Sequence, residues 1–533
     1  MEKAYQLTGQ NLIAGKFSAR GTEKFKAIDP DTMEELPESF CVASEEEIEE
    51  AMQASIAAFR SYQNIDPVQR ALFLEAISQE MLDLDDQLVQ RVMLEAALPE
   101  ARVIGERGRT VGQLRSFAEL IRAGDWVEPV IDLANPGRSP IPKSDIRKCL
   151  KPLGPVVVFG ASNFPLAYST AGGDTAAALA AGNTVVVKGH PSHPGTTELV
   201  AAAIVRAAQS TGMPKGVFSM LQDNGIEVGT ILVSHPLTKA VGFTGSYTGG
   251  MALQKLAMER PEPIPVFAEM GSVNPVLLLP AALEKKGKEI AAQYTGSITM
   301  GAGQFCTNPG LLIGLKGKPL DDFAQSLGEG LAETSPQNML NRGITESYNQ
   351  AVENITRKQG ITAIPSLEAG QGNRCAAQLS MVSGADFLAD PELLHEIFGP
   401  HSLLVCCDST EELEAVVQSL NGQLTGTVIG ENDELGDYIS CIDLLKDKVG
   451  RIIMNGVPTG VEVCAGMHHG GPFPATTDSR FTSVGPDAIR RFARPACYQD
   501  WPNHLLPTAL QDHNPLELNR YVDGKWSMQK ISR

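Results

Sequence analysis

The residues with the clearest chemical potential lie in one stretch of the sequence. It begins with a short apolar run that ends in a carboxylate and a glycine, Val266-Phe267-Ala268-Glu269-Met270-Gly271, and it finishes with a thiol, Gly301-Ala302-Gly303-Gln304-Phe305-Cys306. A thiol framed by glycines can be approached closely by a substrate, and a carboxylate nearby can act on a proton. The pair Cys306 and Glu269 therefore suggests nucleophilic catalysis followed by hydrolysis.

Length and composition limit the remaining possibilities. At 533 residues the chain exceeds the usual size of one hydrophobic core, so we expect at least two domains. A net charge of −19 argues against a surface for nucleic acid or anionic membrane. The nine cysteines are scattered and form no C-x-x-C pair, which favours a reducing compartment. We see no N-terminal basic and apolar leader and no apolar segment long enough to span a membrane, so we expect a soluble cytoplasmic protein.

The middle of the chain has the alternation typical of a doubly wound sheet. Apolar runs that predict strands at 156–160, 184–188, 239–243, 265–268 and 275–279 alternate with helical patterns such as 171–181 and 196–208. Ligands of such sheets bind beyond the carboxyl ends of the strands, where Asn163, Lys188 and the segment 244–246 fall. A nucleotide site is expected there, although neither a G-x-G-x-x-G nor a P-loop pattern is present.

The flanking segments complete the predicted architecture. Ser44 and Glu47 form a capping box at the start of one helix, and two longer helical patterns run over 67–95 and 100–123. The proline-containing segment 135–151 predicts an excursion from the body, and helix and strand patterns resume after Pro280. We expect a dinucleotide-binding domain over residues 1–134 and 152–279 and a catalytic α/β domain over residues 280–484. A hairpin over residues 135–151 and a C-terminal arm over residues 485–533 complete the chain.

Each candidate residue has a plainer alternative when it is taken alone. A lone cysteine in a glycine-rich loop is more often inert, Glu269 could be a salt-bridged strand end, and Asn163 could be a turn residue. Lys188 could be solvated, and Glu396 could belong to a surface turn. The adjacent histidines 468 and 469 resemble half a metal site, but neighbouring side chains point apart and no carboxylate cluster completes them in the sequence. No metal is expected.

Six motifs in order resemble those of the aldehyde dehydrogenase superfamily, over about residues 10 to 490. They are Ser162-Asn163-Phe164-Pro165, Val185 to Lys188, Phe243-Thr244-Gly245-Ser246, Glu269-Met270-Gly271, Gln304-Phe305-Cys306 and Glu396-Ile397-Phe398-Gly399-Pro400. Within the family, the segments 159–165 and 187–191 are most similar to the branch of 2,5-dioxopentanoate (α-ketoglutaric semialdehyde) and bacterial fatty-aldehyde dehydrogenases. The resemblance implies a Rossmann-like cofactor domain, a second α/β domain and an oligomerisation arm.

The resemblance also implies roles for particular residues. Cys306 would attack the aldehyde as its thiolate, the Asn163 amide and the Cys306 N–H would form the oxyanion hole, and Glu269 would activate the hydrolytic water. The presence of Glu269 argues for hydrolysis over transfer of the acyl group to coenzyme A. The implied cofactor-binding residues are Lys188, Gly245, Ser246, Gly249, Glu396 and Phe398, and the substrate-binding aromatic residues are Phe164 and Phe305.

Three positions depart from the family pattern. Ser162 stands where tryptophan is common, and Gly172 stands where a lysine is often found. Pro191 stands where enzymes that prefer NAD often have a glutamate for the ribose 2′-hydroxyl, with His190 and His193 close by. Without that carboxylate nothing repels a 2′-phosphate, so NADP is expected to be preferred and NAD to be possible.

The substrate and assembly are read from the same resemblance. Arg109 lies at a usually apolar position of a helix that resembles the one lining the family's substrate tunnel, so it is a candidate clamp for the carboxylate of a keto acid. A surface arginine near Glu106 is the alternative. The expected substrate is 2,5-dioxopentanoate, with medium- or long-chain fatty aldehydes, an inactive binding protein of the same fold, or a thioester-forming acyltransferase as alternatives. The hairpin and arm would support a homodimer or homotetramer.

Overall fold

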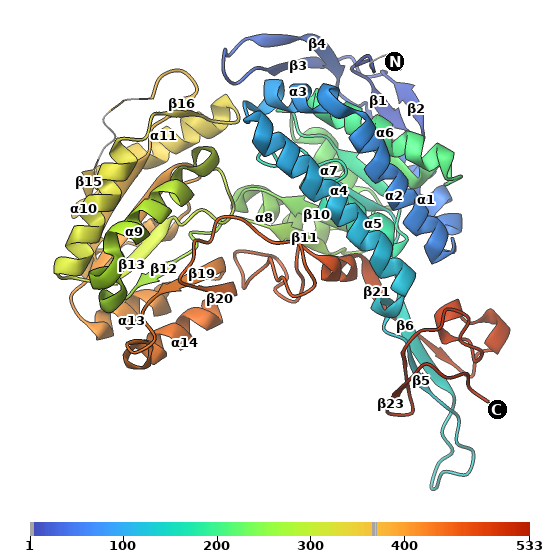
Figure 1. Cartoon of the computed structure of the whole chain (residues 1–533). Coiled ribbons are helices and arrows are strands. Elements are labelled where there is room, and N and C mark those ends of the chain that lie inside the picture. Colours follow the sequence, from blue (N-terminus) through green and yellow to red (C-terminus); the bar gives the residue numbers. More distant parts are fainter. Residues whose placement is uncertain (1–4, 365–367, 369, 533) are drawn as a thin grey trace.

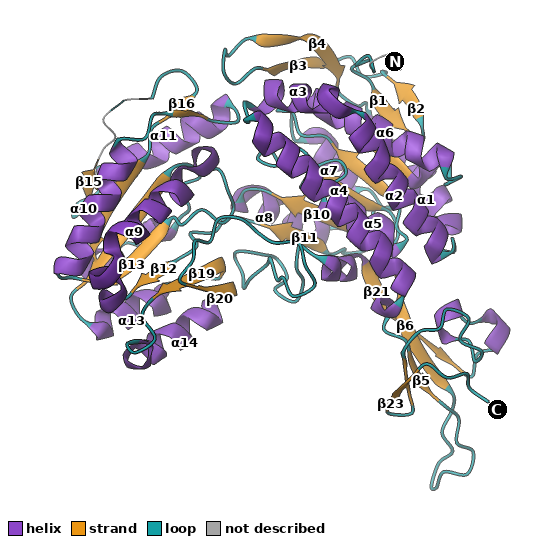
Figure 2. Ribbon diagram, viewed as in Figure 1, coloured by secondary structure: helices purple, strands orange, loops and turns teal. Residues whose placement is uncertain are grey.

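The chain forms two lobes and a projecting arm (Figures 1 and 2). The computed structural model describes residues 5–364, 368 and 370–532. Each lobe is built on a seven-stranded sheet with helices on both faces, and the arm carries a five-stranded sheet. The predicted α/β class is confirmed.

The first sheet has the order β11-β10-β7-β8-β9-β1-β2. The five strands from β11 to β9 are parallel, and β1 and β2 join antiparallel at the other edge. The strands are β11 (Val266–Glu269), β10 (Ala240–Thr244), β7 (Val156–Phe159), β8 (Val185–Lys188), β9 (Phe218–Leu221), β1 (Asn11–Ile13) and β2 (Lys16–Ser18).

Helices cover this sheet on both faces because its strands are apolar at consecutive positions. Val156 and Val158 pack into a core shared with one set of helices, and Val157 packs into a second core on the other face. The helices of this lobe are α1 (Glu45–Tyr62), α2 (Pro67–Asp83), α3 (Asp85–Ala96), α4 (Glu100–Ala123), α5 (Gly173–Ala181), α6 (Pro194–Ser210), α7 (Glu227–Ser234) and α8 (Tyr247–Met258).

The second sheet has the order β15-β17-β18-β13-β12-β19-β20 and is parallel except for β15. Its strands are β15 (Thr362–Ile364), β17 (Gln378–Ser383), β18 (His401–Cys407), β13 (Leu311–Leu315), β12 (Val276–Leu278), β19 (Gln423–Ile429) and β20 (Val449–Met454). Its helices are α9 (Pro280–Thr299), α10 (Lys318–Ala332), α11 (Arg342–Thr356), α12 (Gly384–Ala389), α13 (Thr410–Ser419) and α14 (Ile439–Lys448).

Two sequence-based expectations about these elements are wrong. The strand predicted at 275–279 was expected in the first sheet, but β12 pairs with β13 and β19 in the second. An apolar run predicts a buried strand without saying which sheet it joins. The helical pattern over 67–95 is also broken, since Asp85 adopts a positive φ of 40° and separates α2 from α3.

The arm is built from segments far apart in the sequence. Its sheet has the order β21-β6-β5-β22-β23, with β5 (Val130–Asp132) and β6 (Ile146–Pro152) forming the hairpin and β21 (Ala493–Gln499), β22 (Arg520–Val522) and β23 (Lys525–Ser527) coming from the C-terminal region. Two short pairs lie elsewhere, β3 (Lys24–Ile28) with β4 (Glu35–Cys41) and β14 (Gln337–Asn338) with β16 (Arg374–Cys375).

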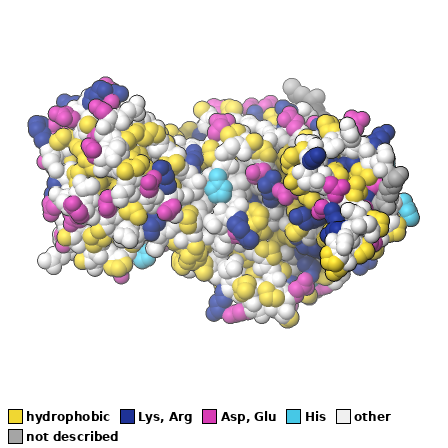
Figure 3. Space-filling model, turned by 90° about the horizontal axis from the view of Figure 1, so that it is seen from below, with side chains coloured by type: hydrophobic (Ala, Val, Ile, Leu, Met, Phe, Trp, Pro, Cys, Tyr) yellow, Lys and Arg dark blue, Asp and Glu magenta, His cyan; other side chains and the backbone are white. Residues whose placement is uncertain are grey.

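The surface gives two further observations. Seen from below, acidic and basic side chains are interspersed over the visible face (Figure 3). A search of the described residues found no helix with the length and apolar character needed to cross a bilayer.

Candidate active site

The loop before Cys306 is shaped by three consecutive residues in the left-handed region. Gly301, Ala302 and Gly303 have φ values of 55°, 56° and 66°. A Cβ at Gly303 would lie 2.3 Å from the backbone of Gly399, so the loop and the segment after it approach too closely for a side chain. This explains the glycines in the motif: they let the chain turn sharply and present the cysteine.

Asn274 fixes the backbone on the other side of the thiol. Its side-chain amide donates to the carbonyl oxygens of Cys306 and Asn308, at 2.8 Å each. Asn274 is itself buried and in the left-handed region, with φ 47°. The thiol is therefore held from both sides, and Cys306 remains partly exposed.

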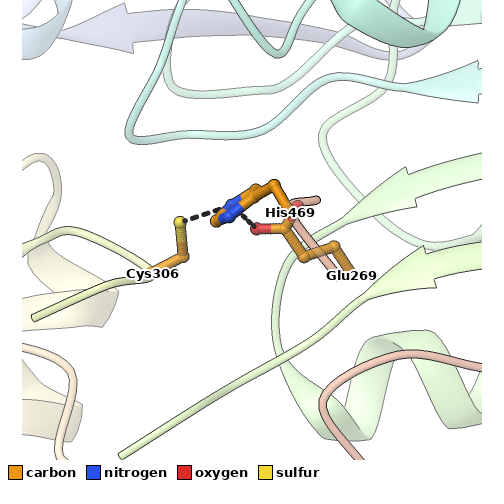
Figure 4. Close-up of side chains that lie close together, drawn as sticks. All are labelled: Glu269, Cys306 and His469. Carbon is orange, nitrogen blue, oxygen red and sulfur yellow. Dashed lines mark hydrogen bonds and ion pairs between the residues drawn. The ribbon is translucent and has the colours of Figure 1, made fainter. Parts of the chain in front are cut away.

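The Cys306 sulfur lies beside a histidine and a carboxylate (Figure 4). His469 Nε2 is 3.4 Å from Cys306 Sγ and 3.0 Å from Glu269 Oε1. The Ser483 hydroxyl donates to Glu269 Oε2, and the Thr482 hydroxyl accepts from the His469 backbone N–H at 2.8 Å. Glu269 ends β11 in the first lobe, whereas Cys306 follows α9 in the second and His469 lies on the long loop after β20.

The electrostatics of this cluster set the resting protonation of the thiol. Burial alone would raise the pKa of Glu269, but His469 and the Ser483 hydroxyl hold it below the ordinary value, so the carboxylate is ionised. Burial, and then the charge of Glu269, raise the pKa of the Cys306 thiol well above its usual range, with Arg109 opposing. The resting sulfur is therefore a protonated thiol at neutral pH, and forming the thiolate requires a base.

The sequence analysis considered His469 only as half of a possible metal site and missed its place beside the thiol. No carboxylate cluster accompanies the histidine pair in the sequence, but in the fold Glu269 is hydrogen-bonded to His469 from the other lobe. The sulfur, the imidazole nitrogen and a carboxylate oxygen all lie within 4.8 Å of one another, a spacing that a metal ion also uses. The same spacing suits a nucleophile, a base and a carboxylate that stabilises the charged base.

Asn163 lies across the nucleophile loop from the histidine. Its amide Nδ2 donates to the Gln304 carbonyl at 3.0 Å, which fixes the side chain beside Cys306 and leaves its second N–H free to bind. The backbone N–H of Cys306 has no acceptor among the described residues. These are the two donors that the sequence assigned to an oxyanion.

A long cavity of about 1290 Å³ begins at this cluster and follows the carboxyl ends of the first sheet. It is lined at one end by Cys306, Glu269 and Asn163 and at the other by Lys188. Its wall also includes the remaining predicted cofactor-binding residues, which are Gly245, Ser246, Gly249, Glu396 and Phe398. The structure thus brings nine residues predicted from six separate motifs to one cavity.

Comparison with known proteins agrees with this arrangement. The Aldehyde dehydrogenase family profile matches residues 17–473, which is most of the chain. The chain is a member of the aldehyde dehydrogenase family. Members of this family oxidise aldehydes to carboxylic acids.

Two curated family members are similar over nearly their whole length. The chain is 48% identical to α-ketoglutaric semialdehyde dehydrogenase 2 of Azospirillum brasilense over 522 residues, covering 98% of this chain and 99% of that protein. It is 45% identical to the α-ketoglutaric semialdehyde dehydrogenase of Acinetobacter baylyi over 518 residues, covering 97% and 98%.

Solved aldehyde dehydrogenase structures share the fold at lower identity. A 1-pyrroline-5-carboxylate dehydrogenase from Thermus with bound NAD has a TM-score of 0.77 at 21% identity and covers 92% of each chain. A betaine aldehyde dehydrogenase point mutant from Staphylococcus aureus has a TM-score of 0.78 at 19% identity, covering 93% of this chain and 97% of that one. At these identities the likeness concerns the fold alone.

The lining of the cavity fits the nicotinamide dinucleotide that aldehyde dehydrogenases use. The N-terminus of α8 opens on it, and the Ser246 hydroxyl caps that helix by accepting from the Gly249 N–H at 3.1 Å. Lys188 is buried there with its ammonium paired to Asp223 at 3.4 Å, so the solvated alternative is wrong. Burial raises the pKa of Glu396 to about 7, and its carboxylate lies against Gly271, where an added Cβ would meet it at 2.4 Å.

The predicted substrate-binding residues cluster on the other side of the thiol. Phe164 packs edge-on against Tyr168 and Phe305, with ring centroids 5.2 and 5.5 Å away. The Arg109 guanidinium donates to the Tyr168 hydroxyl at 3.1 Å and lies over its ring. Neither Phe164 nor Arg109 lines the long cavity. The aromatic cluster therefore lies outside the lining of the long cavity, and we refer to it as the aromatic wall.

The plainer alternative for Arg109, a surface arginine near Glu106, does not match the structure. Glu106 is buried, pairs with Arg102 at 2.6 Å and accepts from two backbone N–H groups. Arg109 is half-buried and makes no ion pair with any described residue. Arg451 is a second arginine of the site that the sequence reasoning missed. Burial lowers the pKa of its guanidinium, whereas the negative charges of Cys306 and Tyr168, when ionised, would raise it, so Arg451 lies within electrostatic reach of both.

The family departures have structural explanations. A Cβ at Gly172 would lie 2.4 Å from the Ala167 carbonyl oxygen, so no side chain fits where relatives often carry lysine. Ser162 is half-buried in the cavity wall. Near Pro191, a carboxylate does lie beside Lys188, that of Asp223 at the end of the neighbouring strand.

Proposed function

We propose that this chain oxidises 2,5-dioxopentanoate (α-ketoglutaric semialdehyde) to 2-oxoglutarate with NAD or NADP as the hydride acceptor and water as the source of the second carboxylate oxygen. The observation that carries the reaction is the cluster of Cys306 Sγ, His469 Nε2 and Glu269 Oε1 at the end of the long cavity. The substrate is proposed from the two relatives at 48% and 45% identity and from the chemistry of the aromatic wall.

Attack begins with removal of the thiol proton. His469 Nε2 lies between the sulfur and the ionised Glu269, so at rest its N–H donates to the carboxylate 3.0 Å away. This nitrogen can take the thiol proton as its own proton passes to Glu269 Oε1, which makes the carboxylate the final acceptor. The thiolate attacks the aldehyde carbon, and the carbonyl oxygen becomes an oxyanion held by the Asn163 amide and the Cys306 N–H. The dinucleotide supplies the hydride acceptor when it is bound, with Glu396 and Phe398 near its nicotinamide end and Lys188 near its adenosine end.

Hydrolysis of the resulting thioester requires a base for water, and Glu269 is proposed for this role. Both of its oxygens are occupied in the resting arrangement, one by His469 and the other by Ser483. Glu269 must therefore exchange its contact with the imidazole for one with water before it can take a proton. The same carboxylate then serves both half-reactions, first as the acceptor of the thiol proton, which it must release, and later as the general base for water.

A carboxylate-bearing substrate suits the cation on the aromatic wall. Arg109 is half-buried and has no ion-pair partner among the described residues, so an anion from outside would compensate its charge. A fatty aldehyde would leave that guanidinium without an anion. This contrast favours the keto acid over the long-chain alternative.

An absorbance assay for reduced nicotinamide over a panel of aldehydes tests the proposal. We expect 2,5-dioxopentanoate to give the highest kcat/KM, above hexanal and decanal, and Cys306→Ser to abolish turnover while the protein stays folded. Equal or faster oxidation of the long-chain aldehydes would reject the substrate. Product formation that depends on coenzyme A would reject hydrolysis.

The organisation of the molecule is part of the same proposal. The dinucleotide-binding domain is assigned to residues 1–134 and 152–279, except that β12 belongs to the sheet of the second lobe. The catalytic domain is assigned to 280–484 together with β12, and the oligomerisation hairpin and arm to 135–151 and 485–533. The arm supports a homodimer or homotetramer, which light scattering would distinguish. The expected preference for NADP over NAD rests on Pro191, and Asp223 beside Lys188 is evidence against it.

A further inference from the structure

Lys188 lines the long cavity, and its buried ammonium meets a buried carboxylate, that of Asp223, just behind the lining. Lys188 is the last residue of β8, and Asp223 follows the neighbouring parallel strand β9, whose Leu221 is in register with Lys188. Their side chains are 10% and 2% exposed, and Lys188 Nζ lies 3.4 Å from Asp223 Oδ2. Parallel strands end at the same edge of a sheet, so a residue far along the sequence reaches the lysine.

The two oxygens of Asp223 have different surroundings. Oδ1 accepts from the Gly225 backbone N–H at 2.8 Å, which fixes the carboxylate in the turn before α7. Oδ2 is buried and makes no hydrogen bond, and its 3.4 Å separation from the ammonium exceeds the 2.7–2.9 Å usual for a charged N–H···O bond. Oδ2 thus retains acceptor capacity beside a cation, an arrangement suited to a hydroxyl group.

We propose that Asp223 binds the adenine-ribose 2′-hydroxyl of the cofactor and thereby selects NAD over NADP. The inference rests on the proposed use of a nicotinamide dinucleotide and deepens it. A ribose hydroxyl donates to the carboxylate, whereas a 2′-phosphate would place a second negative charge against it. The aspartate would do from the end of β9 what relatives often do with a glutamate at the position of Pro191.

The nearby groups offer no charge that would favour a 2′-phosphate. Lys188 is already neutralised by Asp223. Burial lowers the pKa of His190 well below its usual value, so this imidazole is uncharged, and its Nδ1 accepts from the Ser192 N–H. His193 is buried, and its Nε2 is bonded to the Ala161 carbonyl at 2.9 Å.

The test compares the binding of two fragments as well as turnover. Calorimetry with AMP and with adenosine 2′,5′-bisphosphate measures the preference at the 2′-position without any aldehyde, so a failure of the proposed reaction would not obscure the result. We expect the wild-type chain to bind AMP at least about tenfold more tightly than the bisphosphate, and kcat/KM to favour NAD over NADP by a similar factor.

Asp223→Asn keeps the shape and removes the charge. We expect it to weaken AMP and to strengthen the bisphosphate, so that their affinity ratio shifts by about tenfold or more towards the phosphate. Glu227→Gln removes an exposed charge four residues further on and should leave the ratio within about twofold.

Two results would overturn the assignment. One is a wild-type chain that binds the bisphosphate as tightly as AMP or more tightly, a measurement that needs no variant to fold. The other is an Asp223→Asn variant that weakens both fragments equally, which would show that Asp223 only neutralises Lys188.

Discussion

Replacing His469 with glutamine separates its two interactions. Glutamine can still donate a hydrogen bond to Glu269 Oε1, which the imidazole contacts at 3.0 Å, but it cannot take a proton from the thiol 3.4 Å away. The substitution therefore removes the base while keeping the carboxylate partnered. We expect acylation of Cys306 to slow much more than hydrolysis of the thioester.

The size of the effect follows from the pKa of the thiol. Burial and the charge of Glu269 raise that pKa above its ordinary value, which is about 8.5 in a free cysteine. At pH 7 fewer than about 3 in 100 such thiols are ionised. Without a base, the attack on the aldehyde should therefore be at least about 30-fold slower than attack by a fully formed thiolate. A positioned general base typically contributes about 10²–10⁴-fold, which sets the upper range.

Stopped-flow measurement of the first turnover provides the assay. In His469→Gln the rate constant for formation of reduced nicotinamide should fall by at least about 30-fold and should rise with pH beyond pH 9, as hydroxide replaces the missing base. The rate of alkylation of Cys306 by iodoacetamide should show the same pH shift without any cofactor.

His468→Gln is the matched control, because His468 is adjacent in sequence but the hydrogen bond of the Cys306 sulfur is made with His469. It should retain the first-turnover rate of the wild type. If His469→Gln kept that rate within about threefold, with an unchanged alkylation profile, the proposed role of the imidazole would be refuted.

Three other predictions concern single side chains. Glu269→Gln should give one rapid turnover and then slow hydrolysis, by about 10²–10⁴-fold, and an unchanged steady state would exclude it as the base. Arg109→Gln should raise KM for 2,5-dioxopentanoate by about tenfold or more and leave hexanal unaffected; equal changes for both would remove it from substrate binding. Because the folded pKa of Glu396 is about 7 and its ordinary value is 4.5, its burial disfavours the fold as pH rises through this interval. Glu396→Gln should therefore raise Tm more at pH 9 than at pH 5, and the two stabilisations should differ by up to about 3 kcal/mol of unfolding free energy. An equal change in Tm at both pH values would contradict the raised pKa of Glu396.

Much of the fold could be predicted because it depends on local patterns. The capping box of Ser44 and Glu47 is present as predicted, with both hydrogen bonds formed. The apolar runs at 156–160, 184–188, 239–243 and 265–268 all became strands of the first sheet, since valine-rich segments between helices are stable only when buried on both faces. The sheet joined by β12 was not predictable in this way, because pairing is decided by contacts with strands later in the chain.

The two residues most informative about chemistry escaped prediction for one reason. His469 is 163 residues from Cys306 and 200 from Glu269, so in the sequence it stands out only as one of two adjacent histidines. Asp223 likewise meets Lys188 across two parallel strand ends. A sequence motif identifies reactive side chains that lie close together along the chain. A proton acceptor or a counter-charge, by contrast, can come from any segment that folds against the motif. A position that lacks an expected group, such as Pro191, therefore says little until the residues at neighbouring strand ends are known. If Asp223 acts as proposed, cofactor preference depends on the sheet edge as a whole, because a carboxylate beside Lys188 can come from either of two neighbouring strands.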